Sequence, residues 1–120
     1  MNVGSLNWGF ISGTNFVLII YLSFFLVPGS SDMPGIIIPH ADKFGHFFLY
    51  GFQGLSLSFY LSKYNLKNKN TLVFFICLIL GILIEYLQPV LTFNRVFDLF
   101  DILANISGVL TFFSILKFLK

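Results

Sequence analysis

The sequence predicts an all-α membrane protein, a bundle of four transmembrane helices, and two observations support this prediction. Hydrophobic residues make up 57% of the 120 residues and charged residues only 10%, whereas soluble domains carry about 25% charged residues. The apolar residues lie in four stretches that each approach the roughly 20 residues a helix needs to cross a membrane. These stretches are too long for strands and show no period-2 alternation. We therefore expect one transmembrane domain over residues 1–120.

Charge and cysteine content exclude several other classes. A disordered chain needs low hydrophobicity and high charge, and this chain has the opposite composition. The net charge of +2 is too small, and the Lys residues too scattered, for a nucleic-acid groove. The single cysteine, Cys77, permits no intramolecular disulfide, and we expect it to be a small buried side chain.

The four expected spans cover residues 8–27, 44–61, 71–91 and 97–116. The first span is the weakest, because polar residues from Ser12 to Asn15 interrupt it before it ends at Pro28. A signal peptide has a similar length, but no Lys or Arg precedes this run and no small-residue cleavage site follows it. We therefore expect it to remain as a span.

The distribution of basic residues predicts the orientation, because cytoplasmic loops are enriched in Lys and Arg. Five of the seven basic residues lie between the second and third spans or at the C-terminus, whereas Lys43 and Arg95 lie in or beside the other two connectors. An even number of spans places both termini on the same side. We expect a multi-pass protein with both termini in the cytoplasm.

Polar side chains form stripes at the extracytoplasmic ends of three expected spans, where burial without a partner is costly. The residues in each stripe are three or four positions apart, so they share one helix face. Three stripes facing one another would form a single polar cluster, whereas lipid exposure would leave them unsatisfied. The predicted polar cluster comprises Lys43, His46, Tyr50, Glu85, Gln88, Arg95, Asp98, Asp101 and Asn105.

Part of this cluster has a structural interpretation, because inter-helix hydrogen bonds and small residues fix helix packing. This interpretation is favoured for Tyr50, Gln53 and Gln88 as bridges and for Gly54, Gly81 and Gly108 as contact points.

The three acids, Glu85, Asp98 and Asp101, exceed what packing requires and favour a functional role. Lys43 and Arg95 are candidate counter-ions, although either could instead anchor the helix ends at the head groups. We expect Arg95 to contact Asp98 or Glu85, and His46 to contact an acid on the third or fourth span.

No catalytic residue can be assigned from motifs, because the GxSxG and HExxH patterns are absent. A divalent ion held by His46, Glu85, Asp98 and Asp101 is compatible with carboxylate chemistry, but no spacing signature supports it. We therefore assign no metal ligands and no cofactor. A diphosphate head group would need two or more cations, and the nearby acids oppose it unless a cation is shared.

The order and spacing of these polar residues resemble the VanZ-like family. The family's D-K-x-x-H-F-x-x-Y pattern is matched from Asp42 to Tyr50, and its E-x-x-Q pattern is matched by Glu85 and Gln88. An Arg follows in the next connector, and D-x-x-D-x-x-x-N-x-x-G is matched from Asp98 to Gly108. The resemblance implies a bacterial inner-membrane or plasma-membrane protein. The family's namesake is associated with low-level teicoplanin resistance, and most members have no established biochemical activity.

Three functions stay open at this point. The favoured one is a non-enzymatic envelope protein that binds membrane lipids, a lipid-linked envelope precursor or a glycopeptide, with no nucleic-acid partner. The second is a small membrane enzyme acting on a lipid head group, with Glu85 or Asp101 as general acid or base. The third is a structural or assembly subunit in which the polar cluster only holds helices together.

Overall fold

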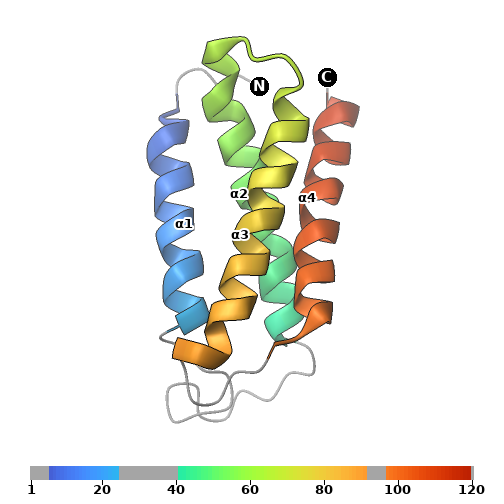
Figure 1. The fold of residues 1–120 in the computed structure, drawn as a ribbon. Coiled ribbons are helices and arrows are strands. Elements are labelled where there is room, and N and C mark those ends of the chain that lie inside the picture. The colour runs from blue at the N-terminus through green and yellow to red at the C-terminus, as the bar shows by residue number, and fades with distance from the viewer. Residues whose placement is uncertain (1–5, 25–40, 92–96, 120) are drawn as a thin grey trace.

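A computed structural model describes residues 6–24, 41–91 and 97–119, and it is helical as expected. The four long helices are α1 (Trp8–Phe24), α2 (Ala41–Leu61), α3 (Lys69–Leu91) and α4 (Leu99–Leu119), with a short 3-10 helix η2 (Ser62–Tyr64) after α2. No strand occurs in these three ranges. Successive long helices run in opposite directions, so α1 begins and α4 ends at the same end of the bundle as η2 (Figure 1).

The chain reverses between α2 and α3 through η2 and two asparagines. Asn65 and Asn68 have positive φ angles of 53° and 57°, a left-handed conformation that Asn adopts more readily than most residues. This short connection keeps α2 and α3 antiparallel. It also places the end of α3 beside the beginning of α2, at the end of the bundle opposite η2 (Figure 1).

Among the residues that the structure describes, two helices are long and apolar enough to cross a membrane, as judged from length and composition. They are α3 over Lys69–Leu91 and α4 over Leu99–Phe118. Helix α1 is apolar but has only 17 residues, and α2 has 21 residues but carries many of the polar side chains. The four helices are therefore present, while the length and hydropathy criterion supports spanning for two of them.

Burial in this bundle is inverted relative to a soluble protein. Polar residues outnumber hydrophobic ones among the buried positions of the described ranges, and large apolar side chains cover the outside of all four helices. Soluble proteins bury apolar residues and bury polar ones far less often. The buried polar residues are Ser12, Asn15, Ser23, His46, Gln53, Ser56, Ser58, Glu85, Gln88, Asp101 and Asn105.

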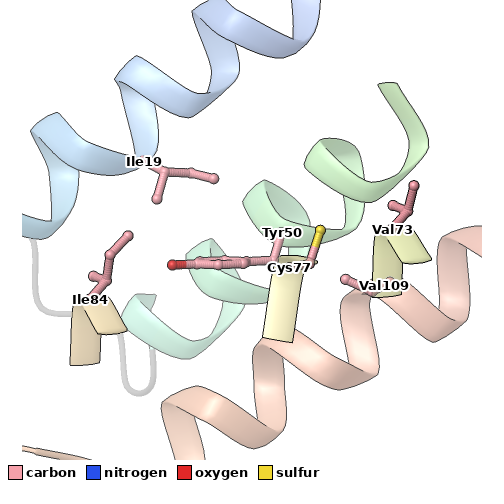
Figure 2. Packing of buried hydrophobic residues seen from close by; sticks show 6 residues of the cluster. All are labelled: Ile19, Tyr50, Val73, Cys77, Ile84 and Val109. Carbon is pink, nitrogen blue, oxygen red and sulfur yellow. The ribbon is translucent and has the colours of Figure 1, made fainter. Parts of the chain in front are cut away.

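A small hydrophobic core lies between the helices and receives side chains from all four of them. Its buried members are Ile19, Tyr50, Val73, Cys77, Ile84 and Val109 (Figure 2). The Tyr50 ring lies at the centre, with its hydroxyl directed toward Ile84 and Ile19 (Figure 2). Cys77 is 1% exposed, which agrees with the expectation of a buried side chain.

Helices α2 and α4 approach each other closely where two glycines meet the neighbouring backbone. A Cβ atom on Gly108 would overlap the carbonyl group of Phe47, at 2.8 Å from its carbon atom. A Cβ atom on Gly51 would lie 2.9 Å from the carbonyl oxygen of Gly108. Small residues permit this kind of backbone approach between helices, and it brings the polar end of α2 against α4.

Candidate functional site

The beginning of α4 is fixed by two carboxylates, one from its own chain segment and one from α3. Asp98 Oδ1 accepts a hydrogen bond from the backbone N–H of Phe100 at 2.9 Å, the contact made by a helix N-cap. Glu85 Oε1 accepts a hydrogen bond from the backbone N–H of Asp98 at 2.8 Å. Helix α4 begins at Leu99, two residues after the approximate start expected for the fourth span, because Asp98 caps it.

Lys43 on α2 is the counter-ion of two acids at this end of the bundle. Its Nζ donates to Asp98 Oδ2 at 2.9 Å and lies 3.4 Å from Asp101 Oδ1. The hydrogen bond from Lys43 is the main reason why the pKa of Asp98 lies below its usual range. The Lys43 side chain is 26% exposed, so it lies at the rim of the site.

The His46 ring is held in place by two neighbours. Its Nδ1 lies 2.8 Å from Asn105 Oδ1 on α4, and its ring stacks on that of Tyr50 with centroids 5.8 Å apart and planes 5° apart. Its Nε2 lies 3.8 Å from Asp101 Oδ2. The contact expected between His46 and an acid on the third or fourth span is therefore present, and the acid is Asp101.

His46, Glu85 and Asp101 form what we call the buried triad. They come from α2, α3 and α4 and are 8%, 0% and 4% exposed. One potential ligand atom from each lies within 4.8 Å of those of the other two. Three titratable groups at this distance in a buried place can exchange a proton or hold a cation.

Asn105 reaches the triad because α3 carries a glycine opposite it. A Cβ atom on Gly81 would lie 2.6 Å from Asn105 Nδ2, so any larger residue would displace the amide. Gly81 therefore acts as a contact point between α3 and α4, the role expected for it.

Gln88 and Tyr50 are two fully buried residues of the predicted polar cluster that lie outside the triad and its contact with Asn105. Gln88 donates from Nε2 to the backbone carbonyl of Ser23 on α1 at 2.9 Å, and the Tyr50 hydroxyl is directed into the core (Figure 2). The Gln88 contact is the bridge between helices that was expected, whereas the Tyr50 hydroxyl has no hydrogen-bond partner among the described residues and so does not form the expected bridge. Arg95 lies outside the described residues, so its contact with Asp98 or Glu85 stays a prediction.

A second polar contact, between α1 and α2, was underestimated from the sequence. Asn15 Nδ2 donates to Gln53 Oε1 at 2.9 Å and to the Leu49 carbonyl at 3.0 Å. Gln53 Nε2 donates to Ser12 Oγ at 2.9 Å. In the sequence, Ser12 and Asn15 interrupt the apolar run of the first expected span. Ser23 lies eight residues after Asn15 and eleven after Ser12, and these separations place all three on one buried face of α1.

The polar contacts thus include the triad with Lys43 and Asp98 beside it, at the end opposite η2, and the α1–α2 contact. No curated protein and no solved structure matches the chain. The VanZ/LLP1 family model matches residues 5–120 and so includes the triad, its rim and the α1–α2 contact. This match, over most of the sequence, agrees with the resemblance found from the spacing of the polar residues. The chain therefore belongs to the VanZ/LLP1 family.

Proposed function

We propose that this protein is a non-enzymatic, multi-pass protein of the bacterial cytoplasmic membrane. It binds an envelope lipid or another amphiphilic ligand at its polar end, which is the end of the bundle that holds Lys43, Asp98 and the triad. In this proposal all four helices cross the membrane, both termini are cytoplasmic, and the triad lies in the outer leaflet. Family membership and the two apolar helices α3 and α4 support a membrane location.

The inverted burial supports membrane crossing by α1 and α2 as well. Helix α1 exposes Phe10, Phe16 and Val17, while α2 exposes Phe44 and Phe48. Most of their polar residues are buried against the other helices, as lipid surroundings require. At 1.5 Å per residue the two helices are about 26 and 32 Å long, close to the roughly 30 Å thickness of a bilayer core.

The observation that carries the binding proposal is the position of Lys43. Its ammonium group bridges Asp98 and Asp101 yet stays partly exposed at the end of the bundle. An anionic head group at the membrane surface has access to this ammonium without entering the core. A purely structural ion pair gains little from exposure, because water screens it.

Lipid analysis of the purified protein tests this proposal, and the chain offers a matched control. Lys69 is also partly buried and donates a short hydrogen bond to Ser62 Oγ at 2.7 Å, but it lies at the η2 end. We expect wild type and Lys69→Met to retain an envelope lipid through purification, and Lys43→Met to lose it. Equal lipid retention by the two variants would contradict binding at the polar end.

The enzymatic alternative is distinguished by turnover. If a retained lipid were converted to a product by wild type but not by Glu85→Gln, the non-enzymatic proposal would be wrong. Glu85→Gln keeps an oxygen that can accept from the Asp98 backbone, so it alters the ionisable group with little change in shape.

Topology and resistance can be tested in cells. A reporter fused after Lys120 or inserted near Asn68 should behave as cytoplasmic, and an extracytoplasmic signal at either place would refute the orientation. If the resistance associated with the family's namesake extends to this chain, its expression should raise the teicoplanin concentration that inhibits growth. Lys43→Met should then lose that effect.

A further inference from the structure

The buried triad of His46, Glu85 and Asp101 has the geometry of a metal site, and we propose that it binds one divalent transition-metal ion, of the type of Mn²⁺ or Zn²⁺. The ligand atoms come from three helices and all lie within 4.8 Å of one another. Ligands about 2.1 Å from one ion lie roughly 3–3.5 Å apart. Small side-chain rotations therefore suffice to close the triad around an ion.

The hydrogen bond between His46 and Asn105 orients the ring as a ligand. An amide oxygen can only accept, so the Asn105 Oδ1 atom, 2.8 Å from Nδ1, places the proton of the neutral ring on Nδ1. The lone pair of Nε2 then faces Asp101 Oδ2 at 3.8 Å. Metal-binding histidines almost always donate their other ring N–H to an oxygen in this way.

A lone pair directed at a carboxylate is repulsive, and a cation between them makes the arrangement attractive. A proton on Nε2 is the competing explanation, since it would convert the contact into an ion pair. The two explanations differ in what the triad binds, so metal titration separates them.

The two carboxylates of the triad are also oriented by contacts outside it. Glu85 Oε1 accepts from the Asp98 backbone at the start of α4, and Asp101 Oδ1 lies 3.4 Å from Lys43 Nζ. Such outer contacts fix ligand direction in metal sites. Asp98 itself lies outside the triad, because its oxygens accept from Lys43 and from the Phe100 backbone.

The mixed ligand set indicates the kind of ion. Imidazole nitrogen suits zinc and other transition metals, whereas carboxylates suit Mg²⁺, Ca²⁺ and Mn²⁺. One imidazole with two carboxylates therefore favours Zn²⁺ or Mn²⁺. Three protein ligands leave at least one coordination position open.

The open coordination position connects the metal site to the proposed lipid binding. This connection, unlike the metal site itself, rests on the proposed function. The acids of the site repel an anionic head group, and a shared divalent cation removes that conflict. A phosphate oxygen of the head group is the ligand expected to complete the coordination, beside the ammonium of Lys43.

Metal binding is tested with the ion alone, on the full-length protein in detergent after treatment with a chelator. We expect one Mn²⁺ or Zn²⁺ per chain, and coupling of the ¹⁴N nucleus of His46 to the Mn²⁺ electron spin in pulsed electron paramagnetic resonance spectra. A folded wild type that binds no stoichiometric ion, or whose Mn²⁺ signal shows no nitrogen coupling, would overturn the proposal.

Variants then assign the ligands. Glu85→Gln and Asp101→Asn should lose stoichiometric binding, and His46→Gln should abolish the nitrogen coupling. Asn105→Ala, a positioning variant, should weaken affinity roughly tenfold to hundredfold. Asp98→Asn keeps an N-cap residue and should bind with near wild-type affinity. Equal loss in Asp98→Asn and Asp101→Asn would indicate general attraction of cations and contradict the assigned ligands.

Failure of metal binding can be distinguished from failure of the proposed function. If the wild type binds no ion but Lys43→Met still loses the co-purified lipid, only the metal inference is wrong. If the triad binds its ion but lipid retention does not depend on Lys43, the metal site stands and the lipid proposal fails.

Discussion

Replacing Gly108 by Ala should force α2 and α4 apart and loosen the whole bundle. The added Cβ would overlap the carbonyl group of Phe47, lying 2.8 Å from its carbon and 3.1 Å from its Cα. Carbon atoms in contact prefer a separation of about 3.5–4.0 Å, so the helices must separate by roughly 1 Å. Backbone cannot rotate away as a side chain can, and the 2.8 Å contact between His46 and Asn105 lies in the same interface.

The size of the effect follows from two contributions. Overpacking of a well-packed interface typically costs about 1–3 kcal/mol, and one inter-helix hydrogen bond in a membrane protein contributes about 0.6 kcal/mol and up to about 1.7. Together they lower the free energy of unfolding by about 1.6–4.7 kcal/mol. Since 1.4 kcal/mol is a factor of ten, the population of molecules with an opened bundle should rise roughly 15-fold to 2,000-fold.

The rate of Cys77 alkylation by a maleimide measures this opening in detergent. Cys77 is the one cysteine of the chain, is 1% exposed, and packs in the core with Val109, the neighbour of Gly108. Gly45→Ala is the matched control, because a Cβ atom there meets nothing within 4 Å. If Gly108→Ala is labelled no faster than Gly45→Ala, the close approach of α2 and α4 is wrong.

Three further predictions concern polar contacts. Arg95→Ala should lower the melting temperature nearly as much as Asp101→Ala. Arg95→Lys should restore it only in part, since Lys lacks the planar guanidinium group that pairs with a carboxylate. An unchanged melting temperature in Arg95→Ala would indicate that Arg95 anchors the chain at the head groups instead. Asn15→Ala removes two hydrogen bonds to α2 and should cost about 1–2 kcal/mol, measured by unfolding in mixed micelles; an unchanged midpoint would contradict their contribution. The contact with Lys43 lowers the pKa of Asp98 in the folded protein. The stabilisation that this contact gives should therefore be complete above the pKa of Asp98 in the unfolded chain, near 3.9, and should be lost as the pH falls through the lower pKa of the folded protein. Fluorescence melts between about pH 2 and 6 should therefore show a weaker acid dependence in Asp98→Asn, and an identical dependence would contradict the pair.

Much of the fold was predictable from local sequence. The four helices follow from the length of the apolar runs, and the convergence of His46, Glu85 and Asp101 at one end follows from antiparallel helices joined in succession. The position of Asp98 before α4 was also readable, because an Asp ahead of an apolar run is an N-cap signal. Hydropathy alone does not place this helix start, because it gives little information about helix caps.

The pairing of individual side chains was decided by the tertiary structure. Periodicity shows which residues share a helix face, but the rotation of each helix about its axis selects the neighbour that this face meets. That rotation directs Gln88 to Ser23 on α1 and turns Asn15 toward Gln53. The close approach at Gly108 likewise depends on two backbones meeting, and it sets the depth at which His46 meets Asn105. Composition and spacing by themselves thus determined a four-helix chain with His46, Glu85 and Asp101 at one end, whereas helix rotation and inter-helix distance, which arise only from packing, decided which polar side chains touch.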